Sequence, residues 1–261
     1  MNGDPIDEGI ALIGFGSSRP YNREALLHCL GLLEGNGRRL YHSFIGRESP
    51  TVSEMMASAR EDGVRRLTVI PFLMSTGEMS LVYIPQKLGI GSGYGEHVSS
   101  LPGNIEIEYT IPLGESPRMA EVFDDMIGRV PPFSGRTAVM LISHGTKSGF
   151  RNGNGDRIRK ILMELGRTDV YTASVEFESP SVRECAETIA EDGFDRIIAV
   201  PMLLASGIHY EEDIPAAFGM GEGTTEGDVL ICGRDIRIVM TPPAGTHPMM
   251  KDILTDIAEG R

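Results

Sequence analysis

Three residues that could bind a metal ion or accept a proton lie at the ends of apolar runs in the second half of the chain. His144 follows "TAVMLIS", Glu176 lies near the end of "DVYTASVEF", and His209 follows "RIIAVPML". Imidazole and carboxylate groups suit a divalent first-row metal, and either can accept a proton near neutral pH. Each histidine taken alone could equally be a hydrogen-bonded loop residue. Both histidines and a carboxylate at such positions favour a shared site.

The elements that must position these residues alternate between strand and helix. The apolar runs have strand length and are nearly continuous, as expected where both faces of a sheet are covered. Between them lie helical segments that begin with capping boxes, Thr51 with Glu54 and Ser181 with Glu184. This order predicts a doubly wound parallel sheet. Ligands bind beyond the carboxyl ends of such strands, near the first and third strands, where the three residues would converge.

The chain contains a second copy of this pattern. Residues 61–90 and 191–220 are identical at 10 of 30 positions without a gap. Flanking motifs keep a spacing near 130 residues, as in "ESPTVSEM" and "ESPSVREC". A period of this length indicates duplication of a whole domain rather than a solenoid. We therefore predict two tandem α/β domains, residues 1–132 and 133–261, joined by the linker "GRVPPFSGRT".

The first copy lacks all three polar groups. In the repeat register, Phe15 corresponds to His144, Gly46 to Glu176 and Met79 to His209. Because glycines, prolines and helix caps are retained while these positions differ, we expect the three residues to form one site, present only in the second half.

The composition of the chain bears on its cellular location and on its binding partners. The net charge of −13 argues against nucleic acid or an anionic membrane surface as a partner. No apolar run reaches the length of a membrane span, and the acidic N-terminus does not resemble a secretory signal, so we expect a cytoplasmic protein. Three widely spaced cysteines favour neither disulfides nor a cysteine metal cluster.

Four motifs of the second half resemble those of a known protein family. "LISHGTK", "ASVEFESPSVRE", "RIIAVPMLLASGIHYEEDIPAAFG" and "PPAGTHPMM" are similar to successive motifs of class II tetrapyrrole chelatases, specifically the sirohydrochlorin cobaltochelatase and ferrochelatase family in its CbiX-like, two-domain form. The first half shows the same motifs in weaker form, so the resemblance covers nearly the whole chain. It implies a chelatase-like fold in each half and a lyase that inserts a divalent metal into sirohydrochlorin without a nucleotide.

The resemblance also implies roles for individual residues. His144, His209 and Glu176 would bind the incoming metal and accept pyrrole protons, with Glu178 as an alternative carboxylate. Local positive charge or backbone donors would be needed for the substrate carboxylates. The candidates for binding the tetrapyrrole are Lys147, Arg151, Ser206 and Gly207, with Arg19 and Arg23 from the first half. His247 matches a family motif but is expected to cap the following helix.

Several alternatives stay open from the sequence. Cobalt, for cobalamin biosynthesis, is the first choice of metal, with iron and nickel as alternatives, because all three accept such ligands. The chain could be a monomer or a homo-oligomer. It could also be a tetrapyrrole or metal carrier without turnover, or an unrelated two-lobed α/β binding protein.

Overall fold

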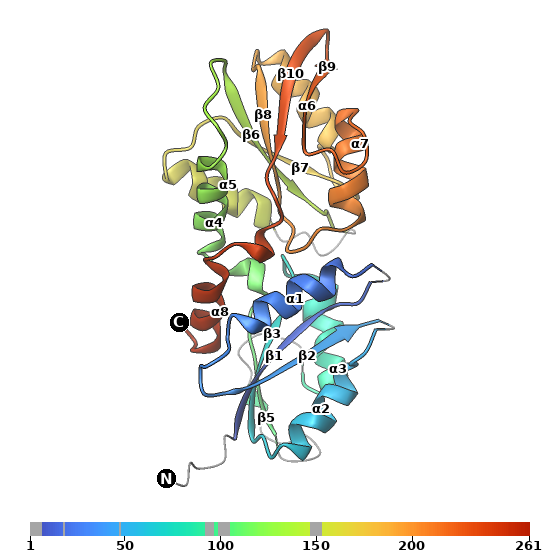
Figure 1. The fold of residues 1–261 in the computed structure, drawn as a ribbon, viewed down its shortest axis with the longest axis vertical. Coiled ribbons are helices and arrows are strands. Elements are labelled where there is room, and N and C mark those ends of the chain that lie inside the picture. The colour runs from blue at the N-terminus through green and yellow to red at the C-terminus, as the bar shows by residue number, and fades with distance from the viewer. Residues whose placement is uncertain (1–6, 18, 47, 92–96, 99–104, 147–152) are drawn as a thin grey trace. The chain divides into compact units, whose positions relative to one another are not determined.

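The computed structural model describes residues 7–17, 19–46, 48–91, 97–98, 105–146 and 153–261. The chain forms two compact units (Figure 1), the first made of Met1–Ser116 and Gly245–Arg261 and the second of Pro117–Ala244. Each unit contains a mainly parallel sheet with helices packed on it. The predicted fold class, two tandem α/β domains with parallel sheets, is confirmed.

The sheet of the first unit has the strand order β2-β1-β3-β5-β4. All neighbours are parallel except β4, which pairs antiparallel with β5. Helices α1 and α8 pack together against β1 and β3, whereas α2 and α3 cover the side that carries Ala11 and Ile13. The elements are β1 (Glu8–Phe15), α1 (Tyr21–Gly31), β2 (Arg39–Ile45), α2 (Val52–Glu61), β3 (Arg66–Pro71), α3 (Ile84–Leu88), β4 (His97–Val98), β5 (Glu106–Tyr109) and α8 (Met250–Ala258).

The second unit repeats this order as β7-β6-β8-β10-β9. Strands β7, β6, β8 and β10 are parallel, and β9 pairs antiparallel with β10. Helices α4 and α5 pack together on one face, and α6 and α7 on the other. The elements are α4 (Met119–Gly128), β6 (Thr137–Ser143), α5 (Asn154–Glu164), β7 (Val170–Ser174), α6 (Val182–Glu191), β8 (Arg196–Pro201), α7 (Ile214–Phe218), β9 (Glu226–Ile231) and β10 (Arg234–Met240).

Strand β9 was not among the strands predicted from the sequence. The segment "EGDVLI" is rich in acidic and glycine residues, so it lacks the apolar run of a buried strand. Its pairing depends on a tight turn, in which Cys232 and Gly233 both have positive φ values, 50° and 74°. Positive φ at both central residues is typical of a two-residue hairpin. The strand therefore forms as an edge hairpin with β10.

The compact units differ from the predicted domains 1–132 and 133–261, because the last helix of each predicted domain packs in the other unit. Helix α4 belongs to the first half in sequence, but it packs against α5 and β8 in the second unit. Helix α8 belongs to the second half, but it packs against α1 and β3 in the first unit. The segment between α4 and β6 also packs within the second unit, since Arg196 donates to the carbonyl of Pro131 and lies over the ring of Phe133.

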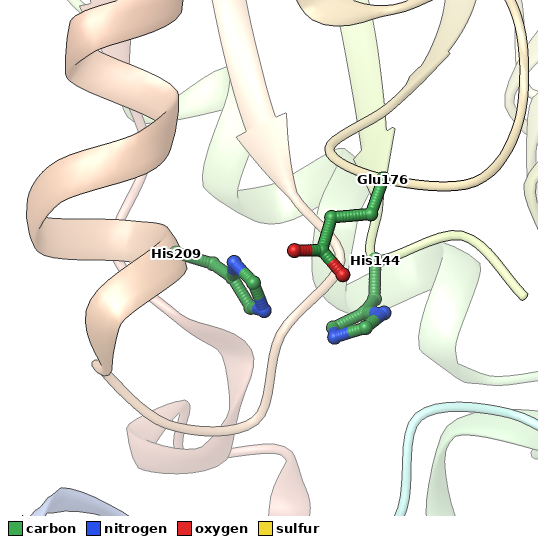
Figure 2. A group of neighbouring side chains, drawn as sticks. All are labelled: His144, Glu176 and His209. Atoms are coloured by element: carbon green, nitrogen blue, oxygen red, sulfur yellow. The ribbon is translucent and has the colours of Figure 1, made fainter.

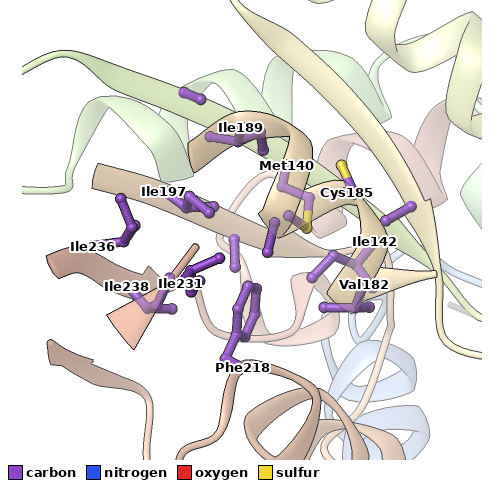
Figure 3. Close-up of a cluster of buried hydrophobic side chains, with 14 of the residues drawn as sticks. Met140, Ile142, Val182, Cys185, Ile189, Ile197, Phe218, Ile231, Ile236 and Ile238 are labelled. Carbon is purple, nitrogen blue, oxygen red and sulfur yellow. The ribbon is translucent and has the colours of Figure 1, made fainter. Parts of the chain in front are cut away.

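A continuous apolar core fills the space between the second sheet and helices α6 and α7 (Figure 3). Met140 and Ile142 of β6 contribute to it, as do Ile238 of β10, Ile189 of α6 and Phe218 of α7. Each fully buried side chain of this size stabilises the fold by about 1.5–3 kcal/mol. This packing fixes the strands whose ends carry the candidate site. Among the residues that the structure describes, no helix is long and apolar enough to cross a membrane.

Both predicted capping boxes are present. Thr51 accepts a hydrogen bond from the N–H of Glu54, and Glu54 accepts one from Thr51; Ser181 and Glu184 do the same. Hydrogen bonds from the Thr51 and Ser181 backbones lower the pKa of Glu54 and of Glu184. The first turns of α2 and α6 are thereby fixed in the same way in both units.

Candidate metal-binding site

His144, Glu176 and His209 converge in the second unit (Figure 2). One ligand atom from each lies within 4.8 Å of the others, and the two imidazole rings are 4.5 Å apart at an interplanar angle of 86°. His144 and Glu176 are exposed and His209 is half-buried. Two imidazoles and a carboxylate at this spacing match the donor set that divalent first-row metals accept.

The ends of three parallel strands bring these residues together. In the sheet register Ser143 lies opposite Ser174, and Ile142 lies opposite Pro201, so β6, β7 and β8 end at the same edge. Hydrogen bonds continue past the end of β7, because the N–H of Glu176 donates to the carbonyl of His144 at 3.0 Å. His144 and Glu176 are therefore held at one level, at the predicted switch point of the sheet.

Gly145 permits this close approach of the two loops. A Cβ atom at this position would lie 1.8 Å from the carbonyl oxygen of Glu176, and the φ of Gly145 is +87°. Both the contact and the backbone conformation exclude other residues without a shift of the loop. The glycine after His144 is thus required for the geometry of the site.

His209 begins a π-helical turn, His209–Asp213, that leads into α7. The N–H of Ile214 donates to the carbonyl of His209, five residues earlier, and the next residue is Pro215. Proline has no N–H and its ring clashes with the carbonyl four residues before it, so a wider turn is favoured here. The turn directs His209 toward His144, as Figure 2 shows.

Hydrogen bonds fix the tautomers of both histidines. Nδ1 of His209 lies 2.6 Å from Oδ2 of Asp213, and Nδ1 of His144 lies 3.0 Å from the carbonyl oxygen of Gly145. Carboxylates and carbonyls accept hydrogen bonds, so each Nδ1 carries the proton. In the neutral form of each ring, Nε2 then has a lone pair that can bind a metal ion or a proton.

Asp213 is a further candidate site residue that the sequence analysis did not assign. It lies four residues after His209, in the segment "HYEED". A carboxylate four residues from a metal-binding histidine on a helix is placed to hold its second nitrogen. The spacing of four residues between His209 and Asp213 is the sequence signal that could have identified Asp213.

The two candidate carboxylates, Glu176 and Glu178, have different contacts. Glu176 belongs to the cluster with the two histidines. Oε1 of Glu178 instead accepts hydrogen bonds from the N–H and the hydroxyl of Thr146, at 3.1 and 2.6 Å. Glu48 makes the corresponding contact in the first unit, with the N–H of Ser17. Glu178 therefore anchors the loop after β6, and Glu176 is the carboxylate that faces the histidines.

The candidate substrate-binding residues are only partly located. Ser206 and Gly207 are half-buried in the loop between β8 and the π-helical turn, where the carbonyl of Gly207 accepts the N–H of Glu211. Lys147 and Arg151 lie outside the described residues. In the first unit, Arg23 is bound to Glu48 and to the carbonyl of Ser49.

A pocket of about 280 Å³ adjoins the cluster in the same unit. Its walls include Glu176 and Asp213, together with Arg183 of α6 and Ala216 of α7. The carboxylate that faces the histidines and the one that holds His209 thus both border this space.

The first unit contains His247 and the three residues that correspond to the candidate metal ligands in the repeat register. Nδ1 of His247 accepts the N–H of Met249, the residue directly before α8. At the position of His144, Phe15 is exposed at the end of β1. Gly46, at the position of Glu176, has a φ of +113°. Met79, at the position of His209, begins the matching π-helical turn, Met79–Tyr83.

The second of the two α/β units thus carries a candidate set of metal ligands at one edge of its sheet. A family model described as CbiX matches the chain twice, over residues 9–130 and 138–259. The chain therefore belongs to the CbiX family, and the resemblance seen in its motifs is confirmed.

Individual relatives agree with this assignment. A sirohydrochlorin cobaltochelatase from Methanococcoides burtonii is 29% identical over 126 residues, which are 48% of this chain and 96% of the relative. One from Sulfurisphaera tokodaii is 32% identical over 121 residues, 46% of this chain and 90% of the relative. Each of these relatives thus corresponds to about half of this chain.

Solved structures share the fold over both halves. SirB from Bacillus subtilis with Fe³⁺ aligns with a TM-score of 0.71 and 19% identity, over 97% of this chain and 94% of that chain. DR2241 from Deinococcus radiodurans, a multi-domain protein with structural similarity to chelatases, aligns with a TM-score of 0.74 and 19% identity, over 97% of this chain and 54% of its own. At such identities these similarities show the fold alone.

Proposed function

We propose that the protein inserts a divalent metal ion into a sirohydrochlorin-type tetrapyrrole without using a nucleotide. The observation that carries this proposal is the cluster of His144, Glu176 and His209, in which both Nε2 atoms keep their lone pairs. The names of the sirohydrochlorin cobaltochelatase relatives support the substrate and suggest cobalt, and hence cobalamin biosynthesis. A cytoplasmic location stays a prediction.

The reaction requires three events at one place. The metal must be held, two N–H protons must leave the macrocycle, and the metal must transfer to the pyrrole nitrogens. Before transfer, the two Nε2 atoms and the carboxylate of Glu176 bind the divalent ion, which is itself a substrate. When the ion moves into the macrocycle, each released ligand regains a free lone pair.

The released ligands can then accept the two pyrrole protons. One metal ion and one tetrapyrrole give one metallated tetrapyrrole and two protons, so charge is conserved. Neutral imidazole and ionised carboxylate are bases of suitable strength near neutral pH. Asp213 and the carbonyl of Gly145 keep the Nδ1 protons in place, so that each base reacts through Nε2.

An anaerobic absorbance assay tests this function. Sirohydrochlorin is mixed with Co²⁺, Fe²⁺ or Ni²⁺ in turn, without nucleotide, and the wild type is compared with His144→Ala and His209→Ala. We expect enzyme-dependent metal insertion, fastest with Co²⁺, that both substitutions abolish. Faster insertion of Fe²⁺ or Ni²⁺ would reassign the metal. Stoichiometric pigment binding without turnover under every metal would contradict the enzyme and favour a carrier.

A further inference from the structure

Two large apolar side chains are exposed beside the metal ligands. Phe177 follows Glu176 directly and is 55% exposed, and Ile208 precedes His209 directly and is 50% exposed. The ring of Phe177 lies 6.2 Å from the ring of His144, with 33° between their planes. Exposed apolar side chains therefore border the cluster of His144, Glu176 and His209, and they come from the loops after two different strands, β7 and β8.

Phe177 keeps this exposed position in an unfavourable backbone conformation. Its φ is +61°, in the left-handed region that bulky residues rarely adopt and that glycine and asparagine adopt more easily. A side chain that is more than half exposed gains little burial energy to offset this cost. Strain of this kind, held at a functional site, points to a role for the residue there.

The apolar pair occurs only in the half that carries the metal ligands. In the repeat register, Phe177 corresponds to Arg47 and Ile208 corresponds to Glu78. Both positions are thus charged in the half where Phe15, Gly46 and Met79 replace the ligands. The copy that has the three candidate ligands also has the apolar pair, and the copy that lacks the ligands lacks the pair.

A tetrapyrrole would present a flat, largely apolar face to such a surface, while its carboxylates lie at the rim. The metal must approach the ring nitrogens from one face, so the macrocycle has to lie over the ligands. Aromatic and aliphatic side chains beside the ligands would hold that face through burial and stacking. We propose that Phe177 and Ile208 form an apolar platform that binds the face of the metal-free tetrapyrrole over the metal ligands. This inference rests on the proposed function.

Substitutions that spare the fold test the platform. Phe177→Asn removes the ring but suits the positive φ, so the thermal midpoint should be unchanged or higher. Ile208→Ser removes the second side chain. We expect each variant to raise the KM for sirohydrochlorin about tenfold, from the loss of apolar contact. Affinity for Co²⁺ alone should stay within about twofold of wild type, because the ligands are untouched.

Matched variants separate the platform from general effects of surface change. Leu230→Ser alters an apolar side chain that is 68% exposed on β9 of the same unit, and its KM should equal that of wild type. Phe177→Leu keeps an apolar side chain and should recover most of the affinity lost in Phe177→Asn. An unchanged KM in the Phe177→Asn/Ile208→Ser double variant would overturn the platform.

The platform and the proposed function can fail separately. If the wild type inserts no metal, the chelatase proposal fails, and equilibrium titration with metal-free sirohydrochlorin decides the platform. Weaker pigment binding in the double variant, but not in Leu230→Ser, would then support it. A wild type that neither inserts metal nor binds the pigment would overturn both.

Discussion

The two units share a scaffold and differ at the carboxyl edge of the sheet. In both, a capping box starts the second helix of the half, a glutamate anchors the loop after the first strand, and a π-helical turn follows the third strand. At the edge itself, His144, Glu176 and His209 face one another in the second unit. The first unit has an exposed aromatic ring, a glycine and a methionine at the matching positions.

This difference separates the features that the two copies share from the candidate site residues of the second copy. The capping boxes, the glutamate that anchors the loop after the first strand and the π-helical turn occur in both copies, because they shape the fold that the two units share. The three candidate ligands, Asp213 and the flanking apolar pair are present in the second copy, and other residues stand at the matching positions of the first. Tyr83 corresponds to Asp213, so the first copy also lacks the carboxylate that would hold a histidine at position 79.

Removing either histidine should have the largest effect. His144→Ala and His209→Ala each delete a proposed metal ligand and proton acceptor, and we expect metal insertion to fall by about 10²–10⁴-fold. Phe15→Ala and Met79→Ala alter the matching positions of the first unit and should leave turnover near wild type. Initial rates with sirohydrochlorin and Co²⁺ measure this. Equal losses of insertion rate from substitutions in the first and the second unit would contradict a site that lies in the second unit alone.

Asp213→Asn should have the next largest effect. The amide can donate as well as accept, so it no longer fixes the Nδ1 proton of His209, and we expect a loss of about 10–100-fold in Co²⁺ affinity or in rate. Glu191→Gln also replaces a carboxylate by an amide, at the end of α6, and is the matched control. Calorimetric titration with Co²⁺ measures the affinity. An unchanged affinity and rate would mean that Asp213 does not position His209.

Transplanting the ligands into the first unit should fail for a reason of backbone geometry. Gly46 has a φ of +113°, which a glutamate adopts only with strain. The triple variant Phe15→His/Gly46→Glu/Met79→His should therefore unfold about 1–3 kcal/mol more easily than the Phe15→His/Met79→His control. It should also bind no second Co²⁺ tightly. A stable triple variant with a second tight site would show that the two loops are interchangeable.

The smallest expected effect is a pH dependence of stability that comes from His42. Burial lowers the pKa of His42 below the usual histidine value of about 6.5, and the charge of Arg23 lowers it further, while Glu48 opposes the shift. As the pH falls through 6.5, the unfolded chain takes up this proton before the folded one, so stability decreases with decreasing pH in this range.

Thr172 is the matching residue of the second unit, so His42→Thr is the natural test. The free energy of unfolding should fall less between about pH 7.5 and about pH 5.5 in this variant than in the wild type. Chemical denaturation at both pH values measures it. The same pH dependence in both proteins would exclude His42 as the source.

Much of this architecture could be predicted from the sequence, because its main signals are local. Apolar runs, the capping residues of α2 and α6, and the period near 130 gave the parallel strands and the duplication. The switch point then placed His144, Glu176 and His209 together without any contact being known. These signals depend on strand polarity and helix caps, which the sequence reveals directly.

Other features depended on contacts that the sequence does not reveal. Strand β9 has no apolar run, and its pairing follows from a turn with two positive φ values. The positions of α4 and α8 depend on packing between distant segments. Glu176 and Glu178 are only two residues apart, and only the hydrogen bonds of Glu178 to Thr146 distinguish them.

Titration of the metal-free protein with Co²⁺ under anaerobic conditions, followed by absorbance of the bound ion, tests the central claim most directly. We expect one tightly bound Co²⁺ per chain, lost in the His144→Ala/His209→Ala double variant and retained in the Phe15→Ala/Met79→Ala double variant. Tight binding that survives loss of both histidines, or that depends on the first unit, would contradict a single metal site in the second unit.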